Sequence, residues 1–167
     1  MSYHIYTTKG FVLSSRPWRE ADRIYHVMTR DLGLIRATAI GVRKEVSKLR
    51  GSLEPVVLAN ISLVRGKEFW RVTSSEFLEK IEPKPALMRP LALLEKLVQG
   101  EDPHPALFDT LEKSILNPDP DAEMFETSLV AQILFLLGYL KEIDLTLDKK
   151  ALVKAINEGL EESQLTK

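Results

Sequence analysis

The residues with the clearest chemical potential form a basic cluster between Gly41 and Gly51. Its members are Arg43, Lys44, Lys48 and Arg50, and the only acid in this stretch is Glu45. Arg36 lies shortly before the cluster. A guanidinium can offer a phosphate two parallel hydrogen bonds, whereas a lysine acts as a point charge. The cluster therefore predicts a phosphate-binding edge, although a solvated loop is the simpler interpretation of a short basic run.

A second cluster, made of Arg16, Trp18 and Arg19, combines an aromatic ring with two cations. An exposed tryptophan beside arginines could stack on a nucleic-acid base, an interaction worth about 1–3 kcal/mol for each base. The alternative is that Trp18 packs over the end of the core as a hydrophobic plug, and the sequence favours this alternative slightly. The side chain of Arg36 could likewise face a ligand or solvent, depending on the register of its strand.

No residue pattern predicts catalysis. Glu20 and Asp22 could be taken for a catalytic carboxylate pair, but no metal ligand or histidine base accompanies them, so we expect them to anchor a turn. Ser47 lacks the glycine-flanked turn of a hydrolase nucleophile. The stretch from Gly41 to Gly51 lacks the Gly-Lys-Ser/Thr ending of a nucleotide-binding loop. We therefore expect neither an enzyme nor a small-molecule substrate.

Composition excludes several other classes of protein. The chain of 167 residues is 44% hydrophobic and 28% charged, as expected for a globular protein. It has no cysteine and only three scattered histidines, so no metal site or other cofactor is expected. The first residues lack the apolar segment of a signal peptide, and Gln132 interrupts an apolar run that is too short to span a bilayer. These features predict a cytoplasmic protein that does not enter a membrane.

The net charge of −1 conceals an opposition between the two halves of the chain. Residues 1–80 contain 14 lysines and arginines against 8 acids, a net charge of +6. Residues 81–167 contain 9 against 16, a net charge of −7. This division indicates that the first half faces nucleic acid, while the second half faces solvent or a protein partner.

Alternating apolar residues predict five β-strands in the first half. The expected strands are residues 5–15, 23–29, 34–42, 56–64 and 68–74. Gly33 stands in the second hairpin, where a positive φ is needed. The small side chains of Ala37 and Ala39 suit the interior of a narrow barrel. Five strands with a long loop after the third predict an oligonucleotide-binding (OB) barrel, in which the loop between the first two strands borders the binding face.

Beyond residue 80 the hydrophobic period becomes helical. The junction is marked by Pro83, Pro85 and Pro90. A third helix is expected to have Pro120 at its first position, and a fourth to begin after Asp148 as its N-cap. The expected architecture is therefore α+β, with a five-stranded OB-fold domain at residues 1–80 and an all-α helical domain at residues 81–167.

The first eighty residues also carry an ordered combination of short motifs. It comprises Lys9-Gly10, Val12-Leu13, Arg16-Pro17-Trp18-Arg19-Glu20, Asp22-Arg23, Thr29, Gly33, Gly41, Arg43, Ser47, Arg50, Gly51, Leu53 and Pro55. In their order and spacing these residues resemble the RecO family of bacterial recombination mediators. The likeness continues more weakly in the second half, through Leu107-Phe108 and the run from Phe135 to Tyr139.

The resemblance implies an OB barrel followed by a helical domain, in a protein of DNA repair and recombination that is not an enzyme. Members of the family bind single- and double-stranded DNA and anneal complementary strands. They work with RecR and single-stranded-DNA-binding protein to help load RecA. The chain departs from the family in two respects, because it is shorter than typical members and lacks the cysteine pairs that hold zinc in many of them. Contacts made through the distal C-terminal part of the family are therefore in doubt.

We therefore expect a DNA-binding and strand-annealing protein of the bacterial cytoplasm, associated with the nucleoid when bound to DNA. The expected DNA-binding residues are Arg16, Trp18, Arg19, Arg36, Arg43, Lys44, Lys48 and Arg50. The alternative is a protein-interaction adaptor, in which the barrel is a scaffold and the helical half makes the main partner contact. The sequence leaves open the preference between single- and double-stranded DNA and the oligomeric state.

Overall fold

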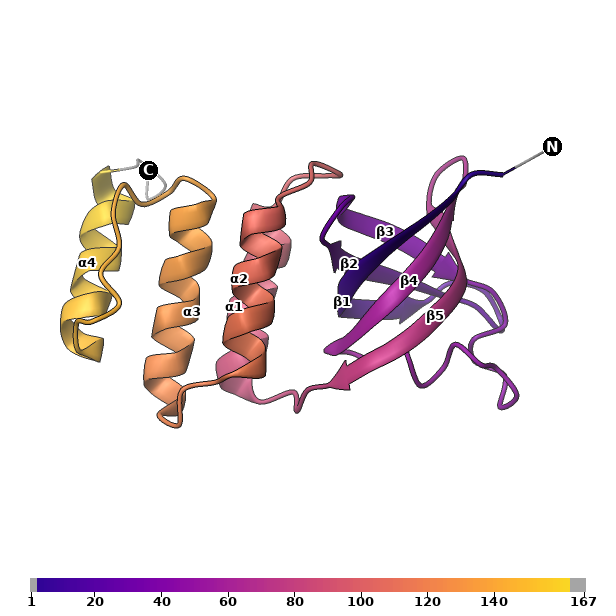
Figure 1. The fold of residues 1–167 in the computed structure, drawn as a ribbon, viewed down its shortest axis with the longest axis horizontal. Helices are drawn as coiled ribbons and strands as arrows, with labels where there is room; N and C mark the ends of the chain where they lie inside the picture. The colour runs from indigo at the N-terminus through magenta and orange to yellow at the C-terminus, as the bar shows by residue number, and fades with distance from the viewer. Residues whose placement is uncertain (1–2, 163–167) are drawn as a thin grey trace. The chain divides into compact units, whose positions relative to one another are not determined.

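The computed structural model of the chain describes residues 3–162, and its backbone divides into two compact units. The first unit extends to Pro83 and also includes Gln99–Pro105, whereas the second includes Lys84–Val98 and continues from Ala106. Strands precede helices along the chain, so the α+β architecture is confirmed (Figure 1). The division into domains at residue 80 stays a prediction.

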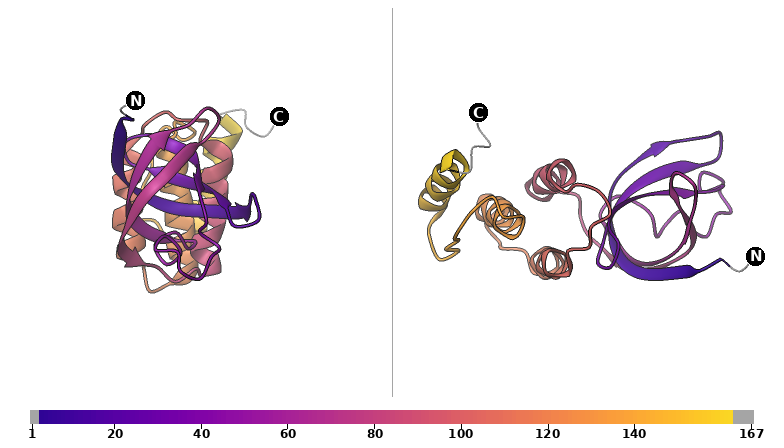
Figure 2. Two further views of the ribbon diagram at one scale, coloured as in Figure 1. Left: turned by 90° about the vertical axis from the view of Figure 1, so that its right-hand side faces the viewer. Right: turned by 90° about the horizontal axis from the view of Figure 1, so that it is seen from above.

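Five strands build the first unit. They are β1 (Ile5–Pro17), β2 (Arg23–Thr29), β3 (Gly33–Ala39), β4 (Val57–Arg65) and β5 (Trp70–Lys80). They close into a barrel (Figure 2). The strand order is β1-β2-β3-β5-β4, and β4 pairs back to β1. Neighbouring strands are antiparallel except β3 and β5, which run parallel where Ala37 pairs with Trp70. This is the five-stranded OB-like barrel that the sequence predicts.

Strand alternation explains why the barrel closes around an apolar core. Ile35, Ala37 and Ala39 on β3 have no exposed surface, as the pattern of the sequence predicts. Because successive side chains of a strand point to opposite faces, Arg36 between them is exposed on the outside. The small alanines leave room for the indole of Trp70, which is buried in the same core.

The β2–β3 hairpin turns at Gly33, which has the predicted positive φ, at 74°. The hydroxyl of Thr29 donates to the carbonyl oxygen of Gly33 at 2.7 Å and so fixes the turn. A Cβ atom at Gly33 would lie 2.6 Å from the carbonyl oxygen of Asp102. Asp102 belongs to Gln99–Pro105, the later segment of the chain that is part of the first unit. Any other residue would therefore clash with this segment as well as strain the turn.

The long loop between β3 and β4, residues 40–56, consists of turns and is anchored at several points. Val42 and Leu53 are buried in the barrel core. The backbone N–H of Gly41 donates to the carboxylate of Asp22 at 2.7 Å. The loop ends at Val56, which is buried and has a φ of 58°, a rare value for a β-branched residue. The backbone N–H of Val56 donates to the carbonyl of Val12 at 2.9 Å and holds it there.

Four helices follow in the described part of the chain. They are α1 (Pro85–Leu97), α2 (Pro105–Leu116), α3 (Ala122–Leu136) and α4 (Lys149–Glu162). Within the second unit α3 packs against α1 and α4, and Leu134 and Leu152 belong to its core. Two details of the sequence prediction are wrong, because Pro90 lies inside α1 and Pro120 precedes α3. Asp148 caps α4 as predicted, accepting the N–H of Ala151 at 2.8 Å. None of the helices within residues 3–162 has the length and apolar character needed to cross a membrane.

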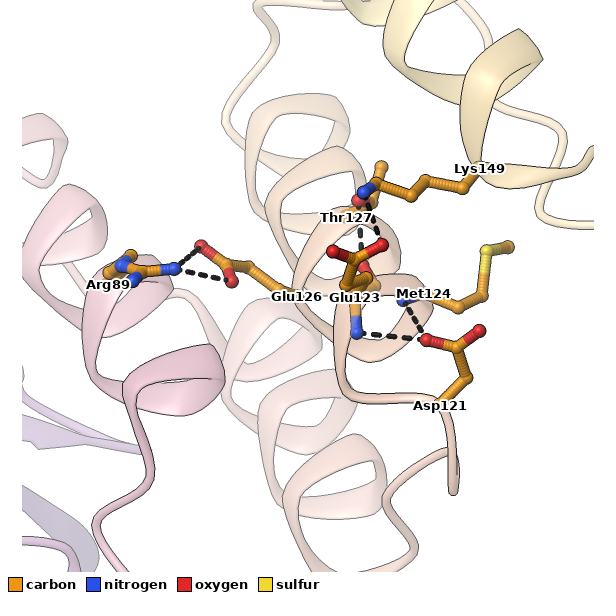
Figure 3. A network of polar contacts seen from close by, with 7 residues as sticks. All are labelled: Arg89, Asp121, Glu123, Met124, Glu126, Thr127 and Lys149. Atoms are coloured by element: carbon orange, nitrogen blue, oxygen red, sulfur yellow. Dashed lines mark hydrogen bonds and ion pairs between the residues drawn. The ribbon is translucent and has the colours of Figure 1, made fainter.

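Polar contacts on the surface of the helical unit connect three of its helices (Figure 3). Arg89 of α1 lies 3.1 Å from the carboxylate of Glu126, and Lys149 of α4 lies 2.5 Å from that of Glu123. Asp121 caps α3 by accepting two backbone N–H groups of its first turn. Exposed ion pairs of this kind contribute about 0–1 kcal/mol each. The apolar core, rather than these contacts, therefore holds the helical unit together.

Candidate nucleic-acid interface

A groove of about 590 Å³ opens on the barrel between two loops. One is the β1–β2 loop, residues 18–22, and the other is the β4–β5 hairpin loop, residues 66–69. Thr38 and Ile40, on and just after β3, line the groove between them. OB barrels bind oligonucleotides with these two loops and the strand face that they flank. The position of the groove on the barrel therefore makes it the candidate interface.

Two aromatic rings meet in this groove, one from each loop. The rings of Trp18 and Phe69 contact each other edge to face, with centroids 5.3 Å apart and planes at 83°. The guanidinium of Arg16 lies 5.7 Å from the centre of the Trp18 ring, and that of Arg36 lies 5.3 Å from the centre of the Phe69 ring. Trp18 is 40% exposed, so part of its ring is open to the groove, and contact of this ring with a base stays a prediction. The groove thus has an accessible aromatic surface on which a base could stack.

The groove also gathers more positive than negative charge. Its cations are Arg19, Arg65, Lys67 and Arg71, and its acids are Asp22 and Glu68. Arg65 forms an ion pair with Glu101 and lies 4.9 Å from the centre of the Trp70 ring. Asp22 is engaged by the backbone of the β3–β4 loop, as the expected role in anchoring a turn requires. The other three cations have no carboxylate partner within residues 3–162 and so present their charge to the groove.

Arg43 makes a structural contact rather than lying free on the basic loop. One terminal nitrogen of its guanidinium donates to the carbonyl oxygens of Arg19 and Glu20, at 3.4 and 3.0 Å. Its backbone N–H donates to the carbonyl of Ala21 at 3.0 Å. These bonds fasten the β3–β4 loop to the β1–β2 loop. Arg43 therefore helps to position one wall of the groove.

The eight predicted DNA-binding residues fall into three groups. Arg16, Trp18, Arg19 and Arg36 gather at the groove, through its lining or through contact with its aromatic rings. Arg43 and Arg50 line a second, smaller pocket, while Lys44 and Lys48 are exposed on the loop and line neither. Contact of any of them with DNA stays a prediction.

The sequence prediction missed the cations of the β4–β5 hairpin. Arg65 and Lys67 lie between the fourth and fifth expected strands, and the position of Arg71 on the outer face of β5 could not be derived from alternation alone. The available signal was the pair of cations beside the glycine, because this hairpin loop borders the binding face of OB barrels. Within residues 3–162 no group of three or more histidines, aspartates or glutamates is arranged to hold a metal ion.

Comparison with known proteins finds one family repeatedly. Residues 1–81 match the family described as "Recombination protein O N terminal". The chain is 32% identical over 166 residues to the DNA repair protein RecO of Synechococcus sp. (strain JA-2-3B'a(2-13)), with 96% of this chain and 53% of that protein covered. It is 30% identical over 149 residues to the DNA repair protein RecO of Dehalococcoides mccartyi (strain ATCC BAA-2266 / KCTC 15142 / 195), with 84% and 59% covered. The chain thus spans about half the length of these relatives.

Proposed function

Because the chain belongs to the RecO family of DNA repair proteins, we propose that its barrel binds DNA without sequence preference. The observation that supports this most directly is the groove, where three cations that have no carboxylate partner among residues 3–162 lie beside the rings of Trp18 and Phe69. Cations attract the phosphate backbone and aromatic rings stack on bases, and both interactions accept any sequence.

This mode of binding suits strand annealing. A protein that holds the backbone and stacks on the faces of bases leaves their pairing edges free for a complementary strand. The protein would then be a non-enzymatic factor of recombinational repair that binds single- and double-stranded DNA and anneals complementary strands in the bacterial cytoplasm. Cooperation with RecR and single-stranded-DNA-binding protein in loading RecA is supported by the family alone.

A salt titration of DNA binding tests the proposal. The affinity of the purified protein for a fluorescent single-stranded oligonucleotide is measured by anisotropy at several salt concentrations. If four to six phosphates are neutralised, the logarithm of the affinity should fall with the logarithm of salt at a slope of about −3 to −4, from roughly −0.7 for each contact. A duplex of the same length measures the preference between the two forms of DNA.

Strand annealing is measured in the same preparations, from the quenching of a labelled strand by its complement. The protein should accelerate annealing at low salt and lose this effect as salt displaces it from DNA. A flat salt response, or an absence of DNA binding, would contradict the proposal. It would favour the adaptor, in which a partner contact of the helical unit is the main function.

A further inference from the structure

A second pocket of about 340 Å³ lies at the barrel and shares no lining residue with the groove. Its walls come from β1, β2 and the β3–β4 loop, and its polar side chains are Ser15, Arg23, Tyr25, Arg43, Arg50 and Glu54. The function proposed above makes no use of this pocket. Its chemistry is unusual because three arginines line one small pocket.

These three guanidinium groups have no carboxylate partner within residues 3–162. The one acid of the pocket, Glu54, is paired with Lys80 at 3.2 Å, so its charge is already offset. Like charges held close together repel one another, and an anion between them would relieve this repulsion. The pocket is therefore electrostatically suited to a negatively charged group.

Protein contacts hold two of the guanidinium groups in place. Arg23 donates from Nε and one terminal nitrogen to the hydroxyl of Ser15, at 3.2 and 2.9 Å. Arg43 uses a single terminal nitrogen for its two backbone carbonyls. Because a guanidinium has five N–H donors, each of these arginines keeps donors for a ligand. Preorganised donors lose little conformational entropy when the ligand binds.

The hydroxyl of Tyr25 adds an independent observation. Tyr25 is only 3% exposed and its ring belongs to the barrel core, yet its hydroxyl makes no hydrogen bond to any described residue. This O–H group is open to the pocket, because it is not among the buried polar atoms that lack a partner, and it can donate to a ligand there.

We propose that Arg23, Arg43, Arg50 and the hydroxyl of Tyr25 form a phosphate-binding pocket separate from the groove. A phosphate group has several acceptor oxygens, which match the forked donors of arginine and the single donor of tyrosine. The inference rests on the proposed function, because the phosphate then belongs to the bound DNA strand. It is either a terminal phosphate or a phosphate within the backbone.

Inorganic phosphate is the first probe, and the melting temperature of the full chain is the readout. Phosphate is compared with chloride at matched ionic strength. The pocket variants are Tyr25→Phe, which keeps the ring and removes only the hydroxyl, and Arg50→Gln. The matched control is Lys44→Gln on the same loop, and the groove control is Lys67→Gln combined with Arg71→Gln.

Phosphate should raise the melting temperature of the unmodified protein and of both controls, because binding to the folded state stabilises it. The rise should fall to less than half in Tyr25→Phe and Arg50→Gln. Three results would each overturn the proposal that the pocket binds phosphate. They are an equal rise in melting temperature in the pocket variants, no rise in the unmodified protein, or a rise that is lost only in the groove control.

Oligonucleotides with a 5′-phosphate or a 5′-hydroxyl then identify the source of the phosphate. If the pocket binds a terminal phosphate, the unmodified protein should bind the 5′-phosphate strand at least threefold more tightly than the 5′-hydroxyl strand. Tyr25→Phe should abolish this preference. If the pocket binds a backbone phosphate, Arg50→Gln should lower the affinity for both strands equally, by at least threefold. The salt slope of binding should also become shallower by about 0.7. Unchanged affinity for both strands would refute the role of the pocket in DNA binding. If phosphate stabilises the unmodified protein but DNA does not bind to it, the proposed function fails and the pocket remains a phosphate site.

Discussion

Reversal of two charges on the β4–β5 hairpin should distinguish DNA binding at the groove from DNA binding elsewhere on the surface. Lys67 and Arg71 are exposed, line the groove and have no carboxylate partner within residues 3–162. Replacing both with glutamate removes two attractive charges and adds two repulsive ones. Because neither side chain packs in the core, the free energy of unfolding should change by no more than about 0.5 kcal/mol for each substitution.

The expected loss of DNA affinity follows from the phosphate contacts removed. Each contact with single-stranded DNA contributes roughly −0.7 to the salt slope, so the loss of two makes the slope shallower by about 1.4. At 0.1 M salt, relative to 1 M, a slope of 0.7 corresponds to about a fivefold gain in affinity for each contact. The double variant should therefore bind about 25-fold more weakly, equivalent to about 1.9 kcal/mol. Repulsion by the new carboxylates would increase the loss.

Fluorescence anisotropy with a single-stranded oligonucleotide measures this loss, and urea unfolding checks that the fold is intact. The matched control is Lys113→Glu combined with Lys150→Glu, because both lysines are exposed on helices and have no carboxylate partner within residues 3–162. The control makes the same change in net charge, so it measures the effect of overall charge alone. An equal loss of affinity in both double variants would refute the assignment of DNA binding to the groove.

Three further predictions concern residues that shape the barrel surface. Arg43→Ala removes the hydrogen bonds to two carbonyls of the β1–β2 loop and should lower the free energy of unfolding in urea by about 0.5–1.5 kcal/mol. Lys44→Ala should leave this free energy unchanged, and equal effects of the two substitutions would contradict the anchoring role of Arg43. Gly66→Ala places a Cβ atom 2.3 Å from the carbonyl oxygen of Phe69, so the hairpin must shift. Both tryptophan fluorescence and DNA affinity should therefore change. If neither changes, this hairpin does not shape the groove. Burial raises the pKa of Tyr25 above its ordinary value of 10.0, although the charge of Arg23 acts in the opposite direction. The fold therefore favours the neutral hydroxyl. Its contribution to the free energy of unfolding is complete below pH 10 and is lost as the pH rises through the raised pKa. Over this range the melting temperature should fall less steeply with pH in Tyr25→Phe than in the unmodified protein, and identical slopes would refute the raised pKa of Tyr25.

The strands of the barrel could be predicted because their apolar residues alternate. The range of β2 agrees with the expectation, and the inward-facing residues of β3 and β4 are those that the pattern indicates. The predicted end of β3 was too late because Val42 is apolar and in phase, yet it reaches the core from the loop. A periodic pattern records burial, and it does not distinguish a strand from an anchored loop.

The candidate site was harder to predict because it is assembled from segments far apart in the sequence. Trp18 and Phe69 meet only because the barrel brings the β1–β2 loop to the β4–β5 hairpin. The charge density of the basic loop could be seen in the sequence, but the hydrogen bonds that give Arg43 a positioning role could not. Charge density along the chain therefore did not reveal the cations of the β4–β5 hairpin, which line the groove.

The order of strands in the barrel also constrains how the chain can fold during synthesis. β1 pairs with β4, and β3 pairs with β5, so the ring stays open until the last strand is in place. Before that moment β3 and β4 expose unpaired backbone groups, which can pair with another copy of the chain. Pairings between distant segments also form slowly, which prolongs this exposure. A fragment cut after Arg65 should therefore aggregate, and an N-terminal piece that folds must extend at least through Lys80.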